Sequence, residues 1–197
     1  MPAKQEKLQE LFFKNRQALR RWLQKNHAQT ESIWLIIYKK NSGVKCITIP
    51  EMVAEGLCFG WIDSKANPID AEKYKLLFAP RKRKSVWSKV NKTRIKRLIE
   101  DGLMAAPGLA KIEAAKKDGS WSAIDDIEEL IMPAALKKAF AKNKTASKHF
   151  EAFPPSAKKI IFHWIIAAKR EETLKKRVLE TVNLAEKNQR ANQYVPK

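Results

Sequence analysis

Polar and aromatic side chains that could bind an anion are concentrated in the stretch from Leu57 to Arg97. We expect a helix to begin at Ser88, and at about 100° per residue Asn91 and Arg94 fall inside its apolar arc. A guanidinium on the core side of a helix needs a partner, because burying an unpaired charge is costly. That partner is either Asp63, in an ion pair that holds the helix to a sheet, or a planar anion such as carboxylate or phosphate. The candidate anion pocket comprises Trp61, Asp63, Arg81, Trp87, Asn91 and Arg94.

The same stretch carries the densest positive charge of the chain. From Lys73 to Arg97 there are eleven Lys and Arg residues and no acid. Such a surface can contact phosphates, and Trp87 could stack on a nucleic-acid base. The alternative is a solvated face that the acidic segment 118–129 partly neutralises. The candidate polyanion surface comprises Lys82, Arg83, Lys84, Lys89, Lys92 and Lys96. The last three are expected to lie on the side of the helix opposite the apolar arc and to face water.

Familiar catalytic and cofactor-binding motifs are absent from the sequence. It contains no GxGxxG, P-loop, GxSxG, HExxH or CxxC pattern. The histidines His27, His149 and His163 lack ligand spacing, so we expect no metal site. Cys58 has no histidine near it in sequence, and we interpret it as a core residue rather than a nucleophile. The sequence therefore favours a protein that is not an enzyme and holds no cofactor.

Composition indicates a globular and strongly basic protein. Of its 197 residues 44% are hydrophobic and 31% are charged, and the formal net charge is +19 at pH 7. Such an excess favours nucleic acid, another polyanion or an acidic protein as the partner. Two cysteines are too few for a disulfide framework. No apolar run reaches the roughly 18 residues of a membrane span, and the first residues do not resemble a secretory signal, so we expect a cytoplasmic location.

Hydrophobic periodicity predicts helices and an antiparallel sheet in the first part of the chain. An amphipathic helix is expected over residues 5–27. Thr48 and Glu51 have the spacing of a capping box, and Pro50 suits a first turn, so a second helix should begin there. The expected strands cover residues 32–39, 44–47, 59–65 and 74–79. Helices against a small antiparallel sheet make an α+β fold.

A change of charge separates this part from a helical remainder. Ser88 predicts a helix that ends near Glu100, and a second helix is expected over residues 107–117. Between Leu98 and Met132 there are eight acids and three lysines, a reversal of sign that can mark a domain boundary. The helices expected after it cover residues 133–142, 145–153, a stretch capped by Ser156, and 171–188. We therefore expect an α+β domain at residues 1–120 and a helical domain at residues 121–197.

Three motifs resemble the bacterial YdeI/OmpD-associated family. They are CFGWIDS at residues 58–64, SVWSKVNKTR at residues 85–94 and WIxxAKRxETxxKR at residues 164–177. The third is similar to the family's C-terminal helical motif. The chain departs from the family at Ser64, Leu174 and Asn188, where Gly, Arg and Gly are expected. The resemblance implies a link to bacteriocin protection and to resistance against cationic antimicrobial peptides, and it implies no reaction, cofactor or catalytic residue.

These observations lead to three functional hypotheses. A protein this basic repels cationic peptides, so protection would work through an anionic partner. The leading hypothesis is thus a cytoplasmic, non-enzymatic stress-response protein that binds an anionic partner or ligand. The second is a nucleic-acid-binding module that uses residues 81–97. The third is an enzyme or small-ligand sensor with a pocket around Asp63 and Arg94.

Overall fold

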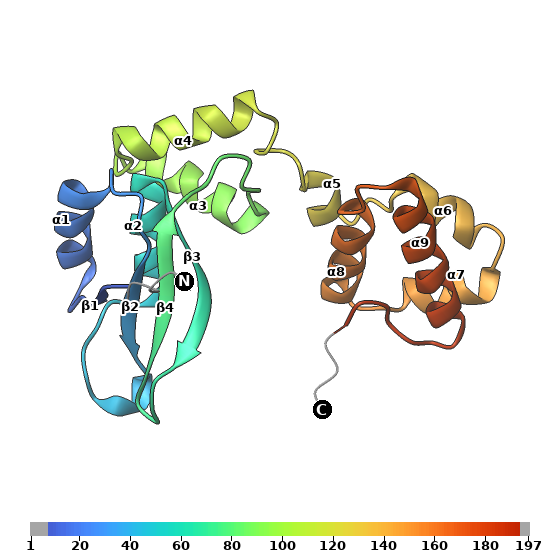
Figure 1. Cartoon of the computed structure of the whole chain (residues 1–197), viewed down its shortest axis with the longest axis horizontal. Helices are drawn as coiled ribbons and strands as arrows, with labels where there is room; N and C mark the ends of the chain where they lie inside the picture. The colour runs from blue at the N-terminus through green and yellow to red at the C-terminus, as the bar shows by residue number, and fades with distance from the viewer. Residues whose placement is uncertain (1–7, 194–197) are drawn as a thin grey trace, which may run out of the picture. The chain divides into compact units, whose positions relative to one another are not determined.

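The computed structural model describes residues 8–193 and divides the chain into a first unit that ends at Ser122 and a second that begins at Ala123 (Figure 1). The first unit contains β1 (Glu10–Phe12), α1 (Arg16–Asn26), β2 (Ile33–Tyr38), the 3-10 turn η1 (Lys40–Ser42), α2 (Ile49–Phe59), β3 (Trp61–Pro68), β4 (Lys73–Pro80), α3 (Lys89–Glu100) and α4 (Ala106–Lys117). The second contains α5 (Asp125–Glu128), α6 (Ala134–Phe140), α7 (Lys144–Glu151), α8 (Pro155–Ile166) and α9 (Glu171–Glu186). The expected α+β class with a helical C-terminal part is confirmed.

The strands form one mixed sheet in the order β1-β2-β4-β3. The pairs β2/β4 and β3/β4 are antiparallel as expected, whereas β1 runs parallel to β2 with Leu11 opposite Leu35. The helix predicted over residues 5–27 is therefore wrong in its first half, and residues 5–7 lie outside the described residues. Asn15 explains the difference, because its side chain accepts a hydrogen bond from the Ala18 N–H and begins the helix only at Arg16.

The strand predicted at residues 44–47 is not formed. Both edges of β2 are already paired, one with β1 and the other with β4, so no edge of that strand is free for a further partner. The segment instead crosses as a loop, and the Ile47 N–H donates to the Phe13 carbonyl at 3.0 Å. Asn67-Pro68, expected in a connection, belongs to β3, where proline is tolerated because β3 is an edge strand.

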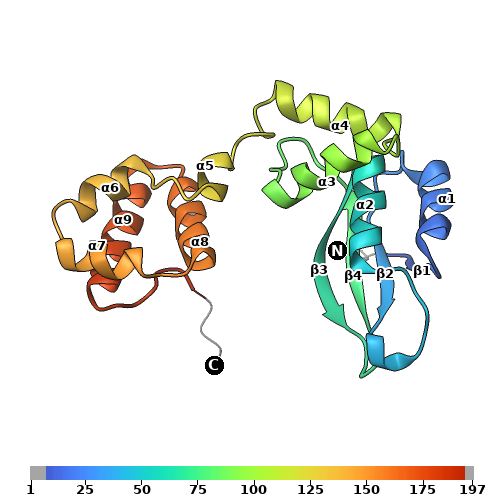
Figure 2. The same ribbon diagram turned by 180° about the vertical axis from the view of Figure 1, so that it is seen from behind.

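Helix α2 is the central helix of the first unit and packs against β3, α1, α3 and α4 (Figure 2). Its predicted capping box is present, since Glu51 N–H donates to Thr48 Oγ1 and the Thr48 N–H donates to the Glu51 carboxylate. Gly108 of α4 allows a close approach, because a Cβ there would lie 2.2 Å from the Cys58 carbonyl oxygen. This packing places α4 over the end of α2 and next to the segment that follows β4.

The second unit is helical, and its core is built from aromatic side chains. Phe140, Phe150 and Phe162 come from three helices and are each at most 3% exposed. The expected cap at Ser156 is wrong: Pro154 occupies the cap position, and Pro155 begins α8, where its missing N–H costs nothing. Among residues 8–193, no helix has both the length and the apolar character needed to cross a membrane.

Candidate anion-binding site

Arg81 is the first residue after β4 and is held by backbone contacts on leaving the sheet. Its N–H donates to the Gly60 carbonyl at 2.8 Å, where Gly60 ends α2 in the left-handed conformation (φ 75°). The residue is only 2% exposed, which is unusual for arginine. The β4 end and the α2 end thus fix this cationic residue in the interior of the first unit.

The guanidinium of Arg81 is only partly satisfied. Nη1 donates to Ser85 Oγ and to the Val86 carbonyl oxygen, each at 2.9 Å. The Cζ atom lies 3.7 Å from the centroid of the Trp87 ring, which is a cation–π contact. Nε and Nη2 are buried and have no hydrogen-bond partner among the described residues. One side of the guanidinium therefore keeps two adjacent donors, the pair that a carboxylate or phosphate engages in a bidentate contact.

The electrostatic setting of Arg81 favours an anion. Burial lowers its pKa well below the ordinary arginine value, to about 10, and the negative charge of Asp63 acts in the opposite direction. The side chain is therefore still protonated at neutral pH, with its charge away from water. Asp63 compensates this charge in part without forming an ion pair with it in the described structure. A bound anion would supply the missing compensation.

A row of stacked side chains extends from Arg81. The rings of Trp87 and Trp121 have centroids 5.2 Å apart, and the Lys92 Nζ lies 5.2 Å from the centroid of Trp121. Trp87 is 1% exposed, and its indole N–H, like the two Arg81 donors, has no partner among residues 8–193. Arg81 and Trp87, which contact each other, thus both keep buried N–H donors that have no partner in the described structure.

A cavity of about 160 Å³ lies beside these residues. Its lining residues are Arg81, Lys82, Arg83, Lys84, Ser85, Trp87, Lys111, Ala114, Ala115, Asp118 and Ser120. Asp118 is an acid on this wall: the neighbouring Ser120, whose N–H donates to Asp118 Oδ1 at 3.0 Å, holds its pKa below the usual range, and Lys84 N–H and Arg83 act in the same direction. The lining still carries more positive than negative side chains, so it favours an anion of small size.

A larger cavity of about 550 Å³ shares Arg81, Lys82 and Lys111 with the small one. Its other walls come from the end of α1, with His27, and from the start of α4, with Pro107. The volume is within the range of small-molecule sites. Arg81 therefore borders both a cavity of phosphate size and a wider one.

The structure brings together only some of the residues proposed for the anion pocket. Arg81 contacts Trp87, and Asp63 acts on Arg81 through its charge. Asn91 and Arg94 instead bond to each other on α3, with Arg94 Nη1 donating to Asn91 Oδ1 at 3.3 Å. Neither of these two is among the residues that line the small cavity. The predicted pocket is thus centred on Arg81 rather than on Arg94.

The Asp63–Arg94 ion pair is not found in the described part of the chain. Its premise was an apolar arc on α3 that included Val90 and Ile99, and these side chains are 58% and 51% exposed. The buried face is narrower and is formed by Ile95 and Leu98. Arg94 therefore lies at the edge of the buried face, half-exposed, and does not need an internal counter-ion.

Trp61 belongs to the core and not to a binding site. It is 1% exposed, its indole N–H donates to the His27 carbonyl at 3.1 Å, and its ring packs against Phe78 and Trp22. With its donor used and its ring surrounded, Trp61 has no free group to offer an anion.

The residues of the candidate polyanion surface fall into two groups. Lys82, Arg83, Lys84, Lys89 and Lys96 are exposed. Lys92, expected to face water, is half-buried because it lies over the ring of Trp121. Sequence reasoning missed Trp121, Ser85 and Lys111 as members of the site. Ser85 has a sequence signal, four residues after Arg81, whereas Trp121 and Lys111 reach the site only through the packing of α4.

A second buried ionic cluster lies in the first unit, away from the cavity lining. Glu55 is 0% exposed and accepts from Arg16 Nε at 2.6 Å and from Arg20 Nη1 at 2.9 Å. Burial and the charge of Glu55 raise the pKa of the Cys58 thiol, which disfavours the reactive thiolate. This cluster joins α1 to α2, and Cys58 is a core residue.

Two family models match the chain. Residues 11–111 match a domain of unknown function (DUF8412), and residues 129–188 match the family described as Bacteriocin-protection, YdeI or OmpD-Associated. The second match contains the WIxxAKRxETxxKR motif, whereas CFGWIDS and SVWSKVNKTR lie in the first. A search of curated proteins and a search of solved structures each found no match.

The first match covers half of the chain and includes Arg81 and Trp87. The second match confirms the expected YdeI/OmpD relationship for the second unit. The chain therefore belongs to the family defined by the domain of unknown function (DUF8412), and it carries a bacteriocin-protection, YdeI or OmpD-associated domain over residues 129–188.

Proposed function

We propose that this protein binds a small oxyanion, a carboxylate or a phosphate group, at the Arg81–Trp87 cavity. The observation that carries the proposal is the buried guanidinium of Arg81, with Nε and Nη2 unpartnered in the described structure. A buried cation without a counter-ion is costly, and an anion that accepts from both donors removes that cost. The Trp87 N–H is a further unused donor beside it.

The size of the small cavity supports a compact anionic group. About 160 Å³ accommodates a phosphate or carboxylate with a few attached atoms, while a larger molecule would have to extend into the neighbouring 550 Å³ cavity. Lys82 and Lys111 border both cavities and would attract the anion from solution. The proposed role is thus ligand binding, without a catalytic step.

The relationship to the bacteriocin-protection family suggests the biological setting. We propose that the protein contributes to protection in the cytoplasm, as part of a stress response, by responding to an anionic ligand or an acidic partner. A net charge of +19 argues against direct capture of cationic peptides, because like charges repel.

The test is a calorimetric titration of the full chain with inorganic phosphate, sulfate and acetate at low ionic strength. Arg81→Lys is the informative variant, because lysine keeps the charge but cannot present two parallel N–H donors. Binding to the wild type that weakens about tenfold or more in R81K supports the proposal. No binding by the wild type, or equal binding by R81K, would contradict it.

A second candidate function is binding of a polyanion such as nucleic acid, which the exposed cations Lys82, Arg83, Lys84 and Lys96 favour. The affinity should then fall steeply with salt, in proportion to the number of phosphates contacted. A titration of a fluorescent oligonucleotide at several salt concentrations tests this. A flat salt dependence, or no binding at low salt, excludes it, and R81K should leave this activity unchanged because Arg81 is buried.

A further inference from the structure

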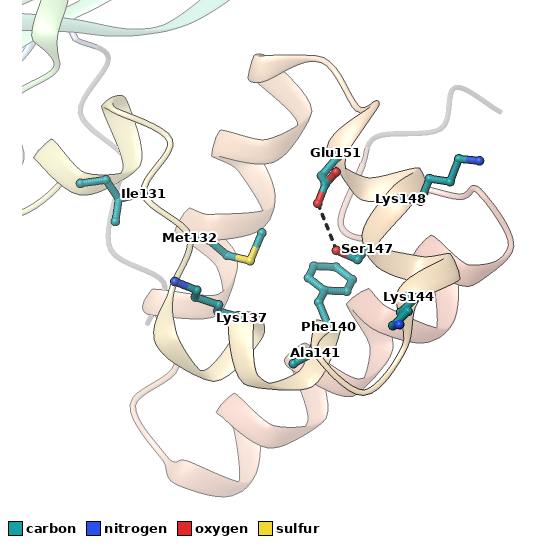
Figure 3. A pocket seen from close by; sticks show the side chains of 9 residues that line it. All are labelled: Ile131, Met132, Lys137, Phe140, Ala141, Lys144, Ser147, Lys148 and Glu151. Carbon is teal, nitrogen blue, oxygen red and sulfur yellow. Dashed lines mark hydrogen bonds between the residues drawn. The ribbon is translucent and has the colours of Figure 1, made fainter.

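Among the described residues of the second unit, hollows lie on two sides of α6. The first has a volume of about 640 Å³ and is lined by residues of α6, α7 and the segment before α6 (Figure 3). The lysines 137, 144 and 148 surround it, and Ser147 Oγ donates to the Glu151 carboxylate at 3.2 Å. The second, of about 560 Å³, lies between α6 and α9. These two hollows are unrelated to the Arg81 site, which belongs to the first unit.

The floor of the α6–α9 groove is apolar. Helix α6 contributes the small residues Ala135 and Ala139, which leave space, and α9 contributes Leu174, Val178 and Val182. Leu179 of α9 also lines the groove and is 61% exposed, the largest exposed fraction among the large hydrophobic side chains of the described residues. Leu179 is therefore not isolated but continuous with the apolar floor of the groove, and a contiguous apolar surface with a polar rim is typical of interaction sites.

The rim of the groove is mainly positive. Lys138 lines it from α6, Lys142 from the turn that follows α6, and Lys175 from α9. The acid on the rim is Glu171, which is paired with Lys175 at 2.8 Å. Lys138 and Lys142 both line the groove, one on α6 and the other just after it, so they form a cationic edge on this side of the groove.

We infer that the groove between α6 and α9 binds an acidic amphipathic helix of a partner protein. An apolar floor with a cationic edge is complementary to a helix that has leucine-like side chains on one face and Glu or Asp beside them. Charge excludes a basic amphipathic helix, since Lys138 and Lys142 would repel it. The groove is bounded by two helices and is open above its floor, which suits one face of a helix better than a lipid chain that needs enclosure.

The dimensions of the groove limit the partner segment. Helix α6 has seven residues, which corresponds to about 10 Å of helix axis. That length accommodates about two turns of a docked helix, with anchors at positions i, i+3 or i+4, and i+7. Leu179, at the exposed edge, is expected to pack between two of these anchors.

The test uses a fluorescently labelled synthetic peptide of about 16 residues, long enough to hold helical structure, with leucines at helical spacing and glutamates elsewhere. The control peptide has lysines in place of the glutamates. Each labelled peptide is titrated with the full-length protein, and its fluorescence anisotropy should show saturable binding for the acidic peptide alone. Leu179→Glu should weaken binding of the acidic peptide at least about tenfold, because it replaces an apolar contact by a negative charge that repels the glutamates of the peptide.

Ile166→Glu is the matched control, since Ile166 is 50% exposed on α8 and does not line the groove. It should bind the acidic peptide as the wild type does. Replacing Lys138 and Lys142 together by glutamate should weaken the binding of the acidic peptide and allow the lysine peptide to bind. Circular dichroism of each variant establishes that it is folded.

Several results would overturn the inference. They are no binding of the acidic peptide at low salt, equal binding of both peptides, and binding that L179E leaves intact. Vesicles of phosphatidylglycerol and phosphatidylcholine are measured in parallel. Vesicle binding that L179E abolishes, without peptide binding, would assign the groove to an anionic membrane surface instead. Because this groove contains no residue of the Arg81 site, its failure leaves the proposed oxyanion site unaffected, and R81K should bind the acidic peptide normally.

Discussion

Replacement of Arg81 by methionine separates the stability of the first unit from its ligand binding. Burial lowers the pKa of Arg81 from the ordinary arginine value to about 10, which corresponds to about 3 kcal/mol of unfavourable free energy for the charged form. Two hydrogen bonds, to Ser85 and Val86, oppose it and contribute about 1.5–3 kcal/mol each for a charged donor. The two hydrogen bonds together equal the cost of burial or exceed it by up to about 3 kcal/mol, so R81M should lower the free energy of unfolding without ligand by at most about 3 kcal/mol.

The wild-type protein should behave differently once an oxyanion is present. An anion that pairs with Nε and Nη2 at about 100 times its dissociation constant adds about 2.7 kcal/mol to the free energy of unfolding. For a unit of about 120 residues, with an unfolding entropy of about 2.1 cal/mol/K per residue, the melting temperature should rise by about 11 °C. R81M lacks both donors and should show no rise.

The assay is thermal unfolding followed by tryptophan fluorescence, because five of the six tryptophans lie in the first unit. Phosphate, sulfate and acetate are compared with chloride at constant ionic strength, so that general screening is equal. Arg97→Met is the control, since Arg97 is an exposed arginine of α3 that does not line the cavity. Equal stabilisation of R81M and the wild type would refute the reasoning, as would the absence of any oxyanion effect on the wild type.

Three further predictions concern the framework of the first unit. Glu55→Gln should lower the free energy of unfolding by about 3 kcal/mol, measured as a shift of the urea midpoint, because two arginines lose their buried counter-ion; a shift near zero would contradict this. Gly108→Ala should cost more than about 2 kcal/mol in the same assay, because the new Cβ meets the Cys58 carbonyl. Hydrogen bonds from the backbone N–H and the hydroxyl of Thr48 lower the pKa of Glu51. The capping box therefore stabilises the fold fully at pH values above the ordinary carboxyl pKa, and this stabilisation is lost as the pH falls through the lowered pKa. The wild type should thus exceed Glu51→Gln in stability at neutral pH and lose this advantage in acid, whereas a difference independent of pH would exclude the cap as its source.

Elements whose signals are local could be predicted from the sequence. The capping box of α2 and the Ser88 cap of α3 depend on residues three apart, which contact each other whatever the rest of the chain does. The segment at residues 10–12 shows the limit of such signals. Its apolar spacing fits a helix, and it becomes a strand because the edge of β2 is available to pair with it.

The candidate site was partly predictable for the same reason. Arg81 and Trp87 were both recognised as members, and they are close in sequence and in space. Arg94 was given the central role because helical periodicity placed it on the buried arc. The structure buries a narrower face, since Val90 and Ile99 are exposed. Periodicity assigns a residue to a side of a helix, but the depth of the neighbouring packing decides whether that side is covered.

Local signals along the chain were enough to predict the α+β class, the helical second part and the concentration of cations around residues 81–97. These follow from periodicity, capping and composition, which act over a few residues. Which cation is buried depends instead on the packing of helices that are distant in sequence. Arg81 is enclosed because α4 packs over the end of α2 and places Lys111 near it, and Trp121 follows in the turn after α4. This enclosure leaves two N–H donors of the Arg81 guanidinium without a partner in the described structure. Whether a buried donor is hydrogen-bonded depends on all its neighbours in space and not on the order of residues along the chain.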